Sequence, residues 1–156
     1  MLGIAALVTA ALFSGAAVYV LVAEHPARRH LEPVAQLTQW KPSYARGAIM
    51  QASLAALSGL LGVGEGIVSL RGGAAGLALP WFIGGALMLS AIAYTFAVIW
   101  GLNGRLKATP IDQASTETVA MLDRWARLHL GRTLLGLGGL LAYAVALDQL
   151  VGFMTT

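Results

Sequence analysis

The sequence predicts an all-α protein, an integral membrane four-helix bundle with an additional cytoplasmic amphipathic helix before the fourth span. Of its 156 residues, 58% are hydrophobic and 11% are charged, against about 45–50% and about 25% in soluble domains. The charged residues are also clustered, and they leave four long apolar segments between them. The 19 Gly residues are typical of membrane helices that pack closely. We expect residues 1–156 to form a single membrane domain.

Each apolar segment is long enough to cross a hydrocarbon core of about 30 Å, which takes about 20 helical residues. The predicted spans are residues 1–23, 47–69, 78–101 and 130–152. No Lys or Arg precedes the first apolar run, so we expect it to be a retained helix and not a signal peptide. Before the third span we expect a Gly-rich turn at Arg71, Gly72 and Gly73, with the helix beginning near Pro80.

Two polar stretches, residues 24–46 and 102–129, connect the spans in pairs. The first contains three X-Pro pairs, which predict a loop. The second contains apolar residues at helical spacing, which predict an amphipathic helix that leads into the fourth span. These residues are Met121, Leu122, Trp125 and Leu128.

The two connections contain eight of the ten basic residues, and Arg132 lies just inside the fourth span on the same side, so only Arg71 belongs to the other side. By the positive-inside rule the connections are cytoplasmic, so both termini are expected on the non-cytoplasmic side of a bacterial-type inner (plasma) membrane. The basic pI then reflects topology and contact with the lipid bilayer, with no nucleic acid as partner. We expect Glu65 and Asp148 at the outer interface, paired with Arg71 or exposed to water.

Unusual polar residues occur where each predicted span meets the cytoplasmic side. Trp125, His129 and Arg132 share one helix face by their i, i+4, i+7 spacing, and Tyr44, Gly47 and Gln51 repeat it. His25 and Asn103 lie at the matching ends of the first and third spans. A site at one mouth of a helix bundle is a common place for a ligand or cofactor.

Two histidines alone do not make a closed zinc site, and the chain has no Cys to complete one. His25 and His129 could supply two axial haem ligands, or part of a copper or iron site that Glu24 or water completes. Alternatively, both are interfacial residues that hydrogen-bond to backbone. His30, beside Arg28 and Arg29, is expected to be solvated.

Three tryptophans, Trp40, Trp100 and Trp125, could form a wall for a flat organic ligand. The alternative is the aromatic belt found at membrane interfaces, which is favoured for Trp40 and Trp100, whereas Trp125 lies one turn before His129. Arg132 needs an anionic or phenolate partner if it is desolvated, unless its side chain reaches water. Asn103 could bind a ligand or cap the third helix.

Several motifs occur in a particular order along nearly the whole chain. They are Glu24-His25-Pro26-Ala27-Arg28, Trp40-Lys41-Pro42-Ser43-Tyr44 with Gly47, Asn103 with Leu106, and Trp125-x-x-Leu128-His129-x-x-Arg132-Thr133. This pattern resembles the anthrone oxygenase-like family of small four-span membrane proteins. The resemblance implies oxidation of polycyclic anthrones to anthraquinones with molecular oxygen. It also implies a site at His25, Trp40, Tyr44, Asn103, Trp125, His129 and Arg132.

Two functions of different classes follow. The first is a membrane-embedded oxidoreductase or oxygenase that acts on a flat hydrophobic phenolic or quinone-like molecule. In it His129, Arg132, Asn103 and Tyr44 are catalytic, and Trp125, Trp40 and Gln51 bind substrate. Its oxygen chemistry uses haem, a copper or iron ion, or no cofactor.

The second function is a non-catalytic membrane module: a haem-binding electron carrier, a lipid-binding protein or a partner subunit. Glycines in the second and fourth spans indicate helix contacts within the bundle or in a homo-oligomer.

Overall fold

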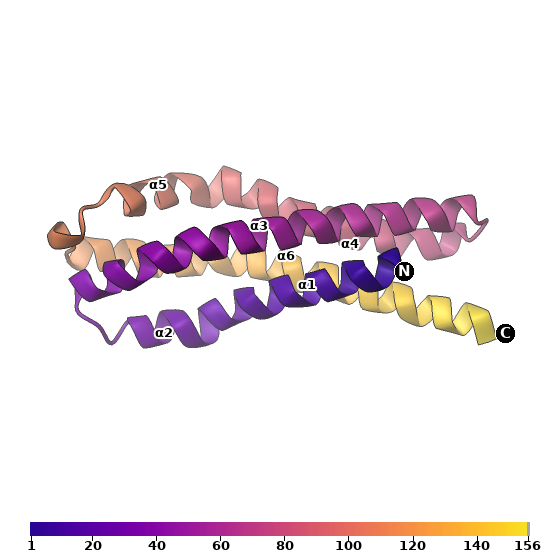
Figure 1. The fold of residues 1–156 in the computed structure, drawn as a ribbon, viewed down its shortest axis with the longest axis horizontal. Coiled ribbons are helices and arrows are strands. Elements are labelled where there is room, and N and C mark those ends of the chain that lie inside the picture. The colour runs from indigo at the N-terminus through magenta and orange to yellow at the C-terminus, as the bar shows by residue number, and fades with distance from the viewer. Residues whose placement is uncertain (156) are drawn as a thin grey trace.

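The structure is a computed structural model that describes the backbone of residues 1–155 and the side chains of residues 1–150. Every regular element in this part of the chain is helical, and four long helical runs lie side by side (Figure 1). All four are long and apolar enough to cross a membrane. The first and last described residues lie at the same end of the bundle as the turn between α3 and α4 (Figure 1). The all-helical, multi-pass fold predicted from the sequence is therefore confirmed.

The first helical run consists of α1 (Leu2–Tyr19), the π-helix η1 (Val20–Glu24) and α2 (His25–Arg28). The second run is the single helix α3 (Pro33–Arg71), and the third consists of α4 (Ala75–Tyr94), the π-helix η2 (Thr95–Ile99) and α5 (Trp100–Ala108). The short 3-10 helix η3 (Ile111–Gln113) precedes the fourth run, α6 (Thr116–Thr155).

The polar stretch 24–46 is largely helical, which corrects the predicted loop. Only residues 29–32 separate α2 from α3, and α3 begins with Pro33 and continues through Pro42. Proline is favourable in a first turn, where its missing N–H has no helical partner. Leu37 and Trp40 are fully buried and share a helix face. Burial of this face stabilises the helix despite Pro42, whose ring removes one backbone hydrogen bond.

The third helix begins earlier than predicted. Gly73 has a positive φ of 80°, and the turn it forms is closed by a hydrogen bond from the Ala74 N–H to the Ser69 carbonyl. This short turn lets α4 begin at Ala75, so Pro80 lies inside the helix and does not open it. Residues 116–129 are helical too, but they are the first turns of α6 and not a separate amphipathic helix.

The half of the bundle near the termini is packed around Tyr143, which is fully buried. Its hydroxyl donates to the Ser58 carbonyl at 2.8 Å, and the Ser58 hydroxyl donates to the Ala6 carbonyl at 2.9 Å. A side chain on Gly62 or Gly84 would overlap the Tyr143 ring. These contacts tie α1, α3, α4 and α6 together without a charged group.

The acids of this half behave differently from each other. The Glu65 carboxylate accepts a hydrogen bond from the Gly3 N–H at 2.8 Å, in the first turn of α1. It therefore satisfies a free backbone donor of that helix, and the predicted pairing with Arg71 is not observed. Asp148 is exposed.

Candidate functional site

All four helical runs contribute to one pocket, in the half of the bundle that holds η1 and η2. Its volume is about 310 Å³, within the range of about 300–1,000 Å³ that is usual for small-molecule sites. The pocket brings together all but one of the residues predicted for the site. They are Trp40, Tyr44, Gln51, Asn103, Trp125, His129 and Arg132.

His25 is the residue that lies elsewhere. Its Nε2 atom is 3.1 Å from the Asp123 carboxylate. Both residues line a second pocket of about 400 Å³ between the first helical run and α6, together with Arg29 and Arg127. The geometry therefore gives no support to His25 and His129 as ligands of one metal ion or haem. Among the described residues no group of three or more His, Asp or Glu side chains could hold a metal ion. His30 is exposed, as expected.

Aromatic rings form one wall of the first pocket. The Trp40 ring stacks on Tyr44 with a centroid distance of 4.7 Å, and it meets Trp125 edge-on at 5.7 Å. The Trp125 ring stacks on His129 at 5.0 Å. Trp40 is 1% exposed and therefore faces the bundle interior, whereas Trp100 is 52% exposed, as a residue of an interfacial belt would be.

Asn103 orients this wall. The Trp125 indole N–H donates to the Asn103 side-chain oxygen at 2.9 Å, and both groups are buried. Because an indole nitrogen can only donate, the Asn103 oxygen is its partner, and the Asn103 amide nitrogen keeps two N–H groups for other acceptors.

Several residues that line the pocket have a buried polar atom without a hydrogen-bond partner, although most such atoms in proteins have one. They are Arg28 Nη1, Trp40 Nε1, Arg132 Nε and both ring nitrogens of His129. The Ala17 carbonyl lies close to the His129 ring, but this contact does not meet hydrogen-bond geometry. The Arg28, Trp40 and Arg132 atoms are donors, and no acceptor among the described residues lies within hydrogen-bond reach of them.

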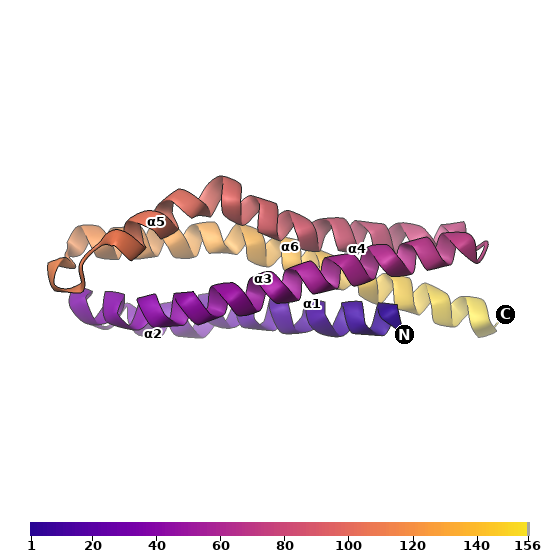
Figure 2. The ribbon, with the colours of Figure 1, turned by 45° about the horizontal axis from the view of Figure 1, so that its top comes forward.

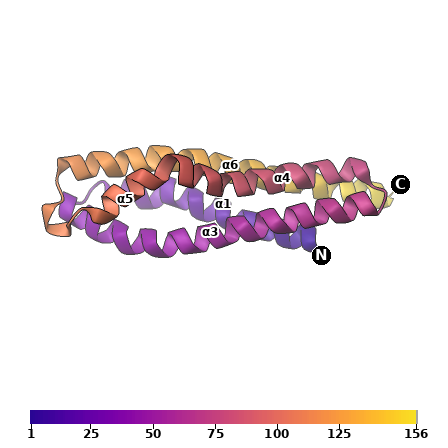
Figure 3. The same cartoon turned by 90° about the horizontal axis from the view of Figure 1, so that it is seen from above.

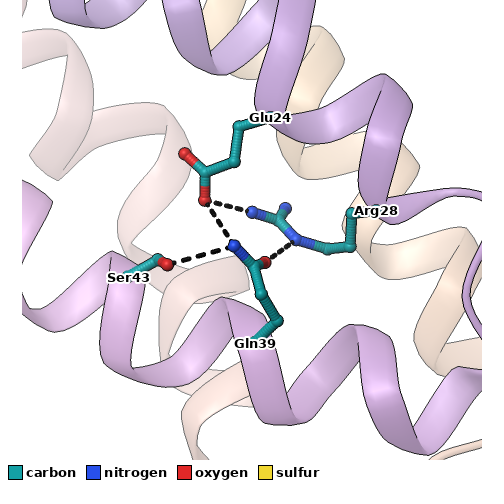
Figure 4. A network of polar contacts seen from close by, with 4 residues as sticks. All are labelled: Glu24, Arg28, Gln39 and Ser43. Atoms are coloured by element: carbon teal, nitrogen blue, oxygen red, sulfur yellow. Dashed lines mark hydrogen bonds and ion pairs between the residues drawn. The ribbon is translucent and has the colours of Figure 1, made fainter.

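The sequence reasoning missed a polar network at the edge of the pocket (Figure 4). Arg28 donates to Glu24 at 2.6 Å and also to the Gln39 side-chain oxygen. The Gln39 amide donates to Glu24 at 3.1 Å and to Ser43 at 3.2 Å. The i, i+4 spacing of Glu24 with Arg28, and of Gln39 with Ser43, is the signal that could have found it.

The charges that line the pocket do not cancel. Glu24 pairs with Arg28, and the Arg132 guanidinium has no carboxylate partner among the described side chains. Instead, its central carbon lies 5.3 Å from the Phe13 ring centroid. The pocket therefore carries one excess positive charge, and it suits a ligand that is or becomes an anion.

Both π-helical segments border the pocket. Val20 and Glu24 of η1 and Ile99 of η2 are among its lining residues. Single π turns inside α-helices frequently occur at functional sites, because the wider turn redirects the following side chains. The sequence contains no pattern by which we could have predicted them.

The fold and this site define a class: a multi-pass membrane protein with a polar and aromatic pocket enclosed by four helices. Residues 40–142, about two thirds of the chain, match the anthrone oxygenase family. The chain therefore belongs to this family, and the matched segment includes every residue predicted for the site except His25. Comparisons with curated proteins and with solved structures return no match.

Proposed function

We propose that this protein is a membrane-embedded oxidoreductase or oxygenase of the anthrone oxygenase type. Its substrate is a flat hydrophobic phenolic or quinone-like molecule that binds in the pocket of Trp40, Trp125 and His129. The observation that carries the proposal is the combination of an aromatic wall with buried donors that lack acceptors. The aromatic rings would hold a planar ring system, and the donors would bind its oxygen atoms.

The proposed reaction begins at the acidic methylene carbon of an anthrone, which lies opposite its carbonyl group. His129 accepts a proton from this carbon, and the negative charge moves to the carbonyl oxygen. Molecular oxygen then adds to the carbon and, with one proton, gives a hydroperoxide. Loss of one water molecule leaves a second carbonyl. Each turnover therefore consumes one O₂ and releases one water, and the anthrone is oxidised to an anthraquinone.

Arg132 and Asn103 are the groups that would stabilise the enolate oxygen. The Arg132 side chain is half-buried and offers an uncompensated positive charge and a buried Nε–H without a partner, and Asn103 lines the same pocket. A fixed positive charge that awaits the developing anion lowers the barrier most in a site shielded from water. Tyr44 and Gln51 complete the polar contacts, as a catalytic hydroxyl and a substrate-binding amide.

Oxygen uptake by the purified protein tests this proposal. In detergent, with anthrone as substrate, we expect His129→Ala to lower turnover by about 100-fold or more, the usual contribution of a general base. His30→Ala is the matched control, because His30 is exposed outside the pocket. An unchanged rate in His129→Ala would remove His129 from the proposed reaction. Anthraquinone binding without oxygen uptake in the unsubstituted protein would favour the alternative function, a non-catalytic membrane module.

Arg132 has its own test in the same assay. We expect Arg132→Ala to lower turnover by about 100-fold, a typical loss when one stabilising group for an oxyanion is removed. Arg132→Lys keeps the charge but not the planar donors, so it should recover part of the rate. Arg105→Ala is the control, because Arg105 is exposed. Equal rates in Arg132→Ala and Arg105→Ala would contradict the role of Arg132.

A further inference from the structure

We propose that the pocket opens sideways into the lipid bilayer, between α1 and α3, and that its ligand enters from the membrane. The opening is bordered by Ala16 and Tyr19 on α1 and by Gly47 and Met50 on α3, all of which line the pocket. The class of ligand, a planar aromatic molecule with an oxygen function, rests on the proposed function. The position of the opening does not.

The end of the bundle that holds the long connections is closed above the pocket. Leu37, Leu106 and Leu122 are completely buried there, in one cluster with Trp40 and Trp125. The Lys41 ammonium donates to the carbonyls of Lys107 and Thr109 at 3.0 and 2.6 Å, and these bonds fasten α3 to the end of α5. An apolar layer therefore separates the pocket from this face on the side of α5 and α6, and the hydrogen-bonded network of Glu24, Arg28, Gln39 and Ser43 lies at its edge on the side of α2 and α3.

The opposite end is closed as well. Phe13 and Met88 are completely buried in the cluster that surrounds Tyr143. This cluster continues through Ala10 and Ala55, and its side chains come from all four helical runs. No route along the bundle axis leads from the pocket to the second face through such a layer, because protein cores are close-packed.

The lining residues that are exposed lie on one side. Asn103 and His129, on α5 and α6, are 1% and 2% exposed, whereas Tyr19 and Met50 are 58% and 47% exposed. Gly47 lies beside them, and a Cβ atom built on it meets nothing within 4 Å. The small residues Ala16 and Gly47 therefore lie between the larger exposed side chains of Tyr19 and Met50. Figure 2 shows α1 and α3 running side by side along this part of the bundle.

The depth of the opening suits a ligand dissolved in lipid. Tyr19 precedes Glu24 by five residues, and Met50 follows Arg46 by four. At 1.5 Å per residue, Tyr19 and Met50 lie about 7.5 and 6 Å below these charged groups, inside the apolar stretch of each helix. An amphiphilic aromatic molecule concentrates at this level, with its rings in hydrocarbon and its oxygen near the headgroups. A lipid chain could fill the space but would leave the buried donors unpaired.

A substitution that narrows the opening tests whether the ligand enters there. Gly47→Leu adds a side chain where the structure has open space, so the bundle should fold. Gly15→Leu is the matched control, since Gly15 is also open but lies outside the pocket. The probe is anthraquinone added to liposomes that contain the protein in a Trp100→Phe background, because the exposed Trp100 would be quenched from the lipid, and the signal is the quenching of Trp40 and Trp125 fluorescence. We expect quenching to develop about tenfold more slowly in Gly47→Leu, as binding then needs a conformational change. Equal rates in the two variants would overturn the proposal.

The absence of cysteine from the sequence allows a second test. Single variants Tyr19→Cys and Met50→Cys are placed in liposomes and treated with a lipid-soluble maleimide or a membrane-impermeant sulfonated one. We expect the lipid-soluble reagent to label both positions, and anthraquinone to protect them. Rapid labelling by the sulfonated reagent from the aqueous side would overturn the proposal, because the opening would then face water.

These experiments separate the opening from the chemistry. Labelling and quenching require no turnover, so protection by anthraquinone without oxygen uptake would keep the lateral opening and remove the oxygenase. Full oxygen uptake in Gly47→Leu would have the opposite meaning: the oxygenase would stand, and the opening would be elsewhere.

Discussion

At the scale of single residues, the bond between Trp125 and Asn103 determines the shape of the candidate site. It joins α5 to α6 across the pocket, with both partners buried. Trp125 in turn stacks on His129 and meets Trp40. One hydrogen bond therefore fixes the plane of the aromatic wall and the direction of the Asn103 amide.

We expect Trp125→Phe to destabilise the protein although a large ring is kept. The Asn103 oxygen would lose its donor in a buried site, which costs about 1–3 kcal/mol. Thermal unfolding in detergent measures this loss. Trp100→Phe is the control, since Trp100 is 52% exposed and removal of its indole N–H leaves no buried acceptor unpaired. Equal unfolding temperatures for the two variants would show that the bond contributes nothing.

Helical spacing predicted most of the site residues, because residues such as Trp125, His129 and Arg132 lie on one face of a regular helix. His25 was placed with them because it lies at the end of the first span, but it follows the π-helical turn Val20–Glu24 and contacts Asp123 instead. Helical spacing also missed Gln39 and Ser43, because only the contact between α2 and α3 brings them beside Glu24 and Arg28. Such partnerships depend on three-dimensional contact between helices, which spacing within one helix does not contain.

At the scale of helices, η1 decides which residues of the first run face the pocket. Ala16, Val20, Glu24 and Arg28 all line it and are four residues apart. In a regular α-helix this series would drift by about 120° around the axis. The wider π turn takes up part of this drift, and so Glu24 and Arg28 stay on the pocket side while His25 contacts Asp123.

Insertion of one residue into η1 tests this role. The π turn already accommodates one residue more than an α-helical turn, so an additional alanine after Val22 should rotate Glu24 and Arg28 by about 100° relative to Ala16. We expect normal helix content by circular dichroism but loss of anthraquinone binding. The control is Val22→Ala, because Val22 is 70% exposed and its side chain contributes little to packing. Unchanged binding after the insertion would show that the π turn does not position the network.

At the scale of the whole molecule, the four runs of apolar residues were sufficient to predict the bundle, because hydrocarbon tolerates few alternatives to long helices. The connections were harder to predict. Pro42 indicates a break in a helix by local rules, yet α3 begins at Pro33 and continues through Pro42. Burial of Leu37 and Trp40 outweighs the local preference, which illustrates why tertiary packing must be known before such stretches can be assigned.

The distribution of charge along the bundle carries the final prediction. The end with α2, α5 and η3 holds nine of the ten basic residues, and the turn between α3 and α4 lies at the other end (Figure 3). By the positive-inside rule the basic end should be cytoplasmic, and the pocket then opens within the inner leaflet. Single cysteines introduced into this cysteine-free chain can test it.

We expect a membrane-impermeant thiol reagent to label Ala75→Cys, at the first residue of α4 beside the turn after α3, in intact spheroplasts. Asp112→Cys, in the connection before α6, should react only after lysis. Both positions are exposed in the structure, so differences in burial do not explain a difference in labelling. The reverse pattern would place the basic end outside, and the ligand would then approach the pocket from the outer leaflet. Because lipid surrounds the bundle at both depths, the lateral route between α1 and α3 would hold in either orientation.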